Sequence, residues 1–223
     1  MNRHAGGMAP PAACLFDLDG LLLDTEPLHA RAWQAAAASF GLDLEPAALL
    51  QLRGRRRRDC AQIVLGWIHA AGLACPNTDA LLAIRQPLAE QLMLLAPAID
   101  GAEALVRRCH SQGMPMALAT SSSKASVALK EAPHPWLGLI TIRVHGDDPE
   151  LRAGKPAPDV FELAAARVGV APQACWAFED SLAGAQAADA AGCRVHVLHT
   201  PAVDPHCLPQ GVVLIESLNA VEF

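Results

Sequence analysis

Two carboxylates that could do chemistry, Asp17 and Asp19, directly follow the short apolar run that begins at Cys14. This pattern indicates a buried strand that ends in a loop. A carboxylate at that position can attack a phosphoryl group if a cation and a lysine offset the repulsion between the two anions. We therefore predict that Asp17 is a nucleophile and that Asp19 is the general acid and base. Gly20 would let the loop turn sharply after the pair.

Polar residues at later strand ends support this interpretation, which two loop aspartates alone would not justify. The segment ALATSSS ends a predicted strand with Thr120, whose hydroxyl could hold phosphoryl oxygens together with nearby backbone amides and with Ser121 and Ser122. Lys155 stands between a glycine and a proline, and it could neutralise both Asp17 and the phosphoryl group.

An acidic pair, Glu179 and Asp180, ends a further predicted strand. Carboxylate oxygens are ligands that Mg2+ takes together with substrate phosphate and water, so we predict a magnesium site formed by Asp17, Asp19, Glu179 and Asp180. Taken singly, the serines could cap a helix, the lysine could be solvated and the acidic pair could form a turn. Their common position at strand ends instead favours Mg-assisted phosphoryl transfer.

The elements that must position these groups fall into two patterns. From residue 97 onward helical and strand patterns alternate, which predicts parallel strands joined by right-handed crossovers, with functional residues at the carboxyl ends. Between residues 25 and 96 apolar residues recur at helical spacing, and Pro87 should kink or split the last helix there. We predict an α/β core of residues 1–24 and 97–223 and an inserted all-helical cap of residues 25–96.

Composition excludes several functional classes. The chain has 223 residues, 52% of them hydrophobic, which suits one core with an insertion. No segment reaches the roughly 18 apolar residues of a membrane helix, and the N-terminus lacks the apolar region of a signal peptide, so we expect a cytoplasmic protein with no membrane partner. Seven scattered cysteines without CxxC spacing indicate neither a disulfide framework nor a zinc site. Nothing indicates an obligatory protein partner.

The positive charges of the predicted cap are concentrated in the segment from Arg53 to Arg58, which contains five of the seven lysines and arginines of the cap. Clustered arginines could follow the phosphates of a nucleic acid. However, the run is short, lacks aromatic partners and belongs to a chain of net charge −6. We therefore expect a small phosphorylated metabolite as partner and no nucleic acid.

The sequence resembles the haloacid dehalogenase superfamily through four motifs, namely FDLDG at residues 16–20, Thr120, Lys155, and Glu179 with Asp180. The resemblance covers nearly the whole chain. It implies a Rossmann-like core with a helical cap that opens and closes over the site. Members with an aspartate at the position of Asp19 act on phosphate esters, so it also implies a phosphatase with an aspartyl-phosphate at Asp17 rather than halide release.

Within the superfamily, FDLDGLLLDTEPLHARAW and GKPAPDVFELAAARVGV are similar to β-phosphoglucomutase and its phosphatase relatives. GDDPE at residues 146–150 is similar to the pseudouridine 5′-phosphatase and glycerol-3-phosphatase group. The β-phosphoglucomutase-like cap pattern L-x-G-x-x-R implies that Arg57, and with less support Arg53, binds the distal part of the substrate. His29 matches a mutase histidine near the cap hinge, although a histidine on a helix is more often a surface or core residue.

We expect an Mg-dependent phosphatase of a small sugar, polyol or nucleoside phosphate. One alternative is a hexose phosphate mutase, but mutases and several phosphatases carry a basic residue three positions after the residue that matches Thr120, where this chain has Ser123. The other alternative is a non-catalytic binding protein on the same fold. The intact Asp17, Asp19 and Lys155 argue against it.

Overall fold

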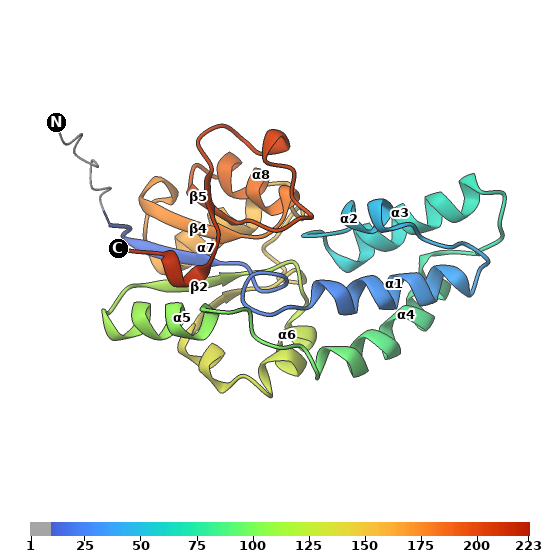
Figure 1. The fold of residues 1–223 in the computed structure, drawn as a ribbon, viewed down its shortest axis with the longest axis horizontal. Helices are drawn as coiled ribbons and strands as arrows, with labels where there is room; N and C mark the ends of the chain where they lie inside the picture. Colours follow the sequence, from blue (N-terminus) through green and yellow to red (C-terminus); the bar gives the residue numbers. More distant parts are fainter. Residues whose placement is uncertain (1–9) are drawn as a thin grey trace.

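The computed structural model describes residues 10–223, and its centre is a six-stranded sheet in the order β3-β2-β1-β4-β5-β6 (Figure 1). The strands are β1 Ala13–Phe16, β2 Met116–Ala119, β3 Ile142–Val144, β4 Cys175–Glu179, β5 Arg194–Leu198 and β6 Val213–Ile215. All neighbouring pairs are parallel. The predicted α/β fold with a Rossmann-like parallel sheet is confirmed.

Helices cover both faces of this sheet. They are α5 Ala102–Ser111, α6 Lys124–Glu131, α7 Asp159–Val168 and α8 Leu182–Ala190. Successive side chains of a strand point to opposite faces. Accordingly Cys14 and Phe16 belong to the core that includes α5, whereas Ala13 and Leu15 belong to the core that includes α7 and α8. Strand β1 is fully buried on both sides, so the loop that follows it has a rigid base.

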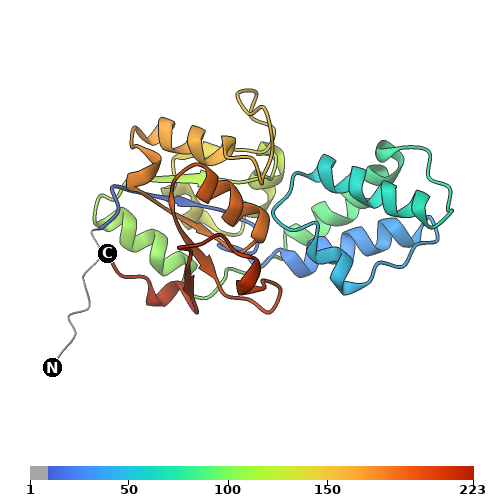
Figure 2. The same ribbon diagram turned by 90° about the horizontal axis from the view of Figure 1, so that it is seen from above.

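Four helices form a second body beside the sheet, as both ribbon views show (Figures 1 and 2). They are α1 Glu26–Ala38, α2 Pro46–Leu50, α3 Arg57–Ala70 and α4 Thr78–Met93. Their apolar faces share a core of their own that includes Trp33, Val64, Ile68 and Leu81. We refer to these four helices and their connections as the helical body. The domain boundaries given above stay a prediction.

Three local features differ from the sequence-based expectation. Helix α4 continues through Pro87, so the proline does not split it, and the kink stays a prediction; α4 packs on α1 and α3, which supports the helix. Strand β6 was not predicted, because three residues at a sheet edge carry too little pattern. Helix α2 was not predicted as a separate helix, because its five residues also carry too little pattern.

Two exclusions can be compared with the structure. The seven cysteines are all free, and six of them are buried. Among the described residues no helix is both long enough and apolar enough to cross a membrane.

Candidate active site

Asp17 lies at the carboxyl end of β1 and is 3% exposed. The Nζ atom of Lys155 is 2.6 Å from Oδ1 of Asp17 and 2.5 Å from Oε1 of Glu179, at the end of β4. All three side chains are buried. The structure therefore brings together a carboxylate from one strand, a carboxylate from its neighbour and a lysine from the loop between β3 and α7, as the order of strand ends predicts.

Burial governs the protonation of this group. It raises the pKa of Asp17 to about 7, because the charge of Lys155 offsets the loss of hydration only in part. Burial also works to lower the pKa of Lys155, but the charges of Asp17 and Glu179 outweigh it and raise that pKa above its ordinary value. Lys155 is therefore a permanent cation next to Asp17, and a second cation there would favour the ionised nucleophile further.

The carboxylates can hold such a cation. Oxygens of Asp17, Glu179 and Asp180 lie within 4.8 Å of one another. Oδ1 of Asp180 is buried and has no hydrogen-bond partner, and buried polar atoms are rarely left so. A hard divalent cation would satisfy that oxygen, so the residues present fit a metal site. Asp19 is not part of the cluster, and its assignment as a metal ligand stays a prediction.

Gly20 contributes to this site through its small size. Its φ of +85° gives the sharp turn expected after Asp19. A Cβ atom at Gly20 would also collide with the carboxylate of Asp180. Any larger residue would therefore displace a side chain of the acidic cluster.

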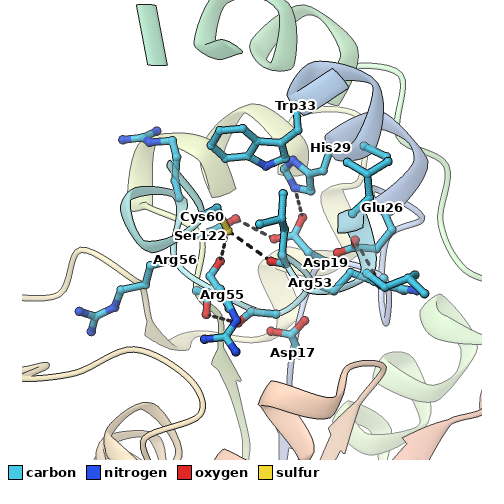
Figure 3. Close-up of a pocket in the computed structure, with 18 of the residues that line it drawn as sticks. Asp17, Asp19, Glu26, His29, Trp33, Arg53, Arg55, Arg56, Cys60 and Ser122 are labelled. Carbon is cyan, nitrogen blue, oxygen red and sulfur yellow. Dashed lines mark hydrogen bonds and ion pairs between the residues drawn. The ribbon is translucent and has the colours of Figure 1, made fainter. Parts of the chain in front are cut away.

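Donors surround the carboxylate of Asp19, and Figure 3 shows His29 and Ser122 beside it. It accepts hydrogen bonds from Thr25 Oγ1 at 2.7 Å and Ser122 Oγ at 2.7 Å. Nε2 of His29 is 3.3 Å away, and Nζ of Lys130 is 2.5 Å from Oδ1 and 2.7 Å from Oδ2. Burial alone would raise the pKa of Asp19, but Lys130 and His29 outweigh it and hold this pKa well below its usual range. Asp19 is therefore an anion in this arrangement.

His29 connects Asp19 to the helical body. Its Nδ1 atom is 2.6 Å from Nη2 of Arg85, which can only donate, so Nδ1 accepts and Nε2 donates to Asp19. Burial lowers the pKa of His29 to about 4, which agrees with this neutral tautomer. The guanidinium of Arg85 lies 4.9 Å from the centre of the Trp33 ring. The histidine is thus fixed by partners on both sides.

The hydroxyl residues after β2 have separate roles. Thr120 is buried, and its Oγ1 accepts from the backbone N–H of Ser122 at 3.1 Å. Ser121 donates to the carbonyl of Gly54 in the helical body at 2.8 Å. Of the three serines, only Ser123 is the N-cap of α6, the ordinary role that the sequence allows for all of them.

The two arginines assigned to the distal part of the substrate point in different directions. Nη2 of Arg53 is 2.5 Å from Oδ2 of Asp180, and Nε of Arg53 is 3.2 Å from Glu26. Arg57 donates to Oε1 of Gln86 within the helical body at 3.0 Å. Arg53 therefore contacts the acidic cluster itself, which the sequence did not indicate.

A cavity of about 740 Å³ lies between the catalytic loops and the helical body (Figure 3). Its wall includes eight of the residues singled out in the sequence, namely Asp17, Asp19, Gly20, His29, Arg53, Arg57, Ser121 and Ser122. Thr120, Lys155, Glu179 and Asp180 are buried behind this wall. Trp33, Leu49 and Leu52 add an apolar part. This cavity can hold an organic group well beyond the phosphate.

Lys130 is the main residue of the site that the sequence analysis missed. It lies in the last turn of α6, ten positions after Thr120, and it belongs to none of the strand-end segments. Its only sequence signal is its position in the helix that directly follows the Thr120 loop.

Comparisons with known proteins agree with this geometry. A model of the family described as haloacid dehalogenase-like hydrolase matches residues 11–192. The chain is 35% identical over 216 residues to the probable pseudouridine-5′-phosphatase of Drosophila melanogaster, covering 92% of this chain and 89% of that protein. It is 31% identical over 195 residues to (DL)-glycerol-3-phosphatase 2 of Arabidopsis thaliana, covering 85% and 80%. The crystal structure of β-phosphoglucomutase from Clostridium difficile has a TM-score of 0.79 at 21% identity, covering 96% and 94%, and shows a shared fold.

Proposed function

The chain belongs to the haloacid dehalogenase-like hydrolases and is a phosphoric monoester hydrolase of that family. We propose that it is an Mg2+-dependent phosphatase that acts through an aspartyl-phosphate at Asp17. One observation carries the proposal. The buried carboxylate of Asp17 lies 2.6 Å from a buried lysine, and it shares an acidic cluster with Asp180, whose Oδ1 lacks any partner. A nucleophile, an anion-neutralising cation and a place for a second cation meet there.

In the proposed first step the Asp17 carboxylate attacks the phosphorus, and the bond to the leaving oxygen breaks. Bound Mg2+, held by Asp17, Glu179 and Asp180, would supply positive charge that offsets the repulsion between the two anions. Lys155 contributes its fixed charge to the same end. Asp19, from the adjoining loop, gives a proton to the leaving oxygen.

In the second step Asp19 takes a proton from water, which attacks the phosphorus and releases phosphate from Asp17. The ionised Asp19 of the structure is the form that this second step needs. The first step needs the protonated form, so one oxygen of Asp19 must gain a proton when substrate enters, and the other oxygen can keep accepting a hydrogen bond. The hydroxyl of Thr120 and the neighbouring amides are the groups suited to hold the remaining phosphoryl oxygens.

The proposed substrates are small sugar, polyol or nucleoside phosphates. A cavity of about 740 Å³ has room for such groups, and its wall carries Arg53 and Arg57 as donors. The names of the relatives point to a nucleoside monophosphate in one case and a polyol phosphate in the other. We keep the assignment of Arg57 to the distal part of the substrate as a proposal.

The helical body is the proposed cap of residues 25–96. Several contacts join it to the core around the site, among them Arg53 with Asp180, the Gly54 carbonyl with Ser121, Arg56 with the Ala153 carbonyl at 2.8 Å, and His29 with Asp19. These contacts support the interpretation that the arrangement corresponds to a closed cap. Entry of substrate would then require that they break.

A screen of phosphate esters tests the proposal. Purified protein should release inorganic phosphate from p-nitrophenyl phosphate and from members of a set of sugar, polyol and nucleoside phosphates, and a chelator should abolish release. Phosphorus NMR on β-glucose 1-phosphate addresses the mutase alternative. Conversion to glucose 6-phosphate faster than phosphate release would contradict the proposal, as would a lack of Mg-dependent release from every ester.

A further inference from the structure

A fully buried lysine on α6 takes no part in the steps described above. Lys130 has no exposed surface. Removing an ammonium from water costs free energy unless hydrogen bonds or opposite charges replace its hydration, so a buried lysine indicates a specific partner. Here the partners are Asp19 and Ser122, which belong to the loops after β1 and β2.

All three N–H groups of the Lys130 ammonium already have acceptors within the protein, so none is left to bind a substrate. An ammonium has three N–H groups. Nζ of Lys130 has three acceptors, namely Oδ1 of Asp19 at 2.5 Å, Oδ2 of Asp19 at 2.7 Å and Oγ of Ser122 at 2.7 Å. Lys130 is also absent from the residues that line the cavity. Its charge therefore reaches the reaction through Asp19 and not through direct contact.

Ser122 extends this connection to the phosphoryl-binding loop. Its hydroxyl donates to Oδ2 of Asp19, and its backbone N–H donates to Oγ1 of Thr120. Helical side chains lean toward the N-terminus of their helix, which lets the long side chain of Lys130 reach back to the loop that precedes α6. One lysine thus ties together the two loops that carry the acid/base and the hydroxyl.

We propose that Lys130 is a positioning residue that holds the Asp19 carboxylate where it meets the leaving oxygen of the substrate. This inference rests on the proposed function, because it assigns Asp19 the role of acid and base.

The test compares leaving groups. Lys130→Met removes the charge and keeps much of the volume. For an alkyl phosphate, whose leaving oxygen needs a proton, kcat/KM should fall about tenfold to a hundredfold, the loss expected for a charge-assisted hydrogen bond. For p-nitrophenyl phosphate, whose leaving group needs no proton, the loss should be far smaller. KM should change little, and Lys130→Arg should recover part of the activity.

The matched control is Lys124→Met. Lys124 lies on the same helix, is exposed and does not line the cavity, so both substrates should be turned over as by the wild type. If Lys130→Met does not fold, as judged by circular dichroism, Lys130→Gln enters the same comparison, because it retains donors but no charge. Equal losses on the two substrates, or a rise in KM alone, would overturn the inference.

A double-mutant cycle separates positioning from a general structural effect. In an Asp19→Asn background the substitution Lys130→Met should cost little further activity, because the group that it positions has already lost its function. Full additivity would overturn the inference. Absence of Mg-dependent activity in the wild type would instead reject the proposed function. Normal wild-type activity with an unaffected Lys130→Met variant would reject the role of Lys130 alone.

Discussion

Gly184 gives a sharp test of the packing behind the nucleophile. It lies in the first turn of α8, and a Cβ atom there would collide with the carboxylate of Glu179. That carboxylate is fully buried and holds Nζ of Lys155 at 2.5 Å, the backbone N–H of Asp180 at 3.1 Å and Oγ of Ser181 at 3.1 Å. A shift of this carboxylate away from the added methyl group would weaken its contact with at least one of these partners. Gly184→Ala should therefore disturb the lysine that faces Asp17.

The magnitude follows from opposing contributions. Replacing glycine by alanine inside a helix normally stabilises a protein by about 0.5 to 1 kcal/mol. Forcing an extra methyl group into a packed site costs about 1 to 3 kcal/mol, and weakening a hydrogen bond between charged groups costs about 1.5 to 3 kcal/mol. Together these contributions predict a net destabilisation of about 1.5 to 5.5 kcal/mol. Turnover should fall about tenfold or more, because a shift of about 1 Å in a catalytic group can cost a hundredfold.

Urea unfolding and steady-state kinetics on p-nitrophenyl phosphate would measure both effects. Gly66→Ala is the matched control, since Gly66 lies in α3 and a Cβ there would meet nothing within 4 Å. That variant should gain about 0.5 to 1 kcal/mol and keep its activity. A Gly184→Ala protein as stable and as active as the Gly66→Ala protein would refute the account of the Glu179 site.

Three further predictions concern the acid/base, the cap and stability. Asp19→Ala should slow turnover of an alkyl phosphate about 100- to 10,000-fold and of p-nitrophenyl phosphate less, and equal losses would contradict an acid/base role. Arg57→Ala should lower kcat/KM about tenfold to a hundredfold for the preferred metabolite but not for p-nitrophenyl phosphate. Arg58 is exposed, so Arg58→Ala should have no effect at high salt. Equal effects of the two substitutions would reject a specific contact of Arg57. Burial lowers the pKa of His196 from 6.5 to about 4, so the unfolded chain binds more protons between these values and stability should fall by up to about 3 kcal/mol as pH drops through this window. Urea unfolding should show a weaker pH dependence for His196→Phe, and an unchanged dependence would reject this origin.

The core of the site was predictable because its residues follow strands. The carboxyl ends of parallel strands meet at one edge of a sheet, so Asp17 and Glu179, which end neighbouring strands, lie together. Lys155 reaches them from the loop between β3 and α7. The helical insertion was visible through its helical spacing of apolar residues. Local patterns of this kind carry the information on which such predictions depend.

The contacts that sequence patterns missed depend on the reach of long side chains across the fold. Lys130 and Arg53 lie in helical or loop segments with no special spacing, yet their terminal nitrogens contact Asp19 and Asp180. Such pairs are separated by more than a hundred residues, so only the packing of α6 and of the helical body on the core determines them. Pro87 is a further case that local sequence patterns do not predict, because tertiary packing keeps α4 continuous at a residue that disfavours a helix.

The most direct test of the central claim is to trap phosphate on Asp17. An acyl phosphate is reduced by borohydride, which converts the aspartate into homoserine. The protein should be mixed with Mg2+ and substrate, quenched during turnover, reduced and digested, and the peptide containing residue 17 should be analysed by mass spectrometry. The account predicts homoserine at position 17 in the wild type only when substrate and Mg2+ are both present, and no phosphate release by Asp17→Asn. Full turnover by Asp17→Asn, or trapping at another carboxylate, would contradict it.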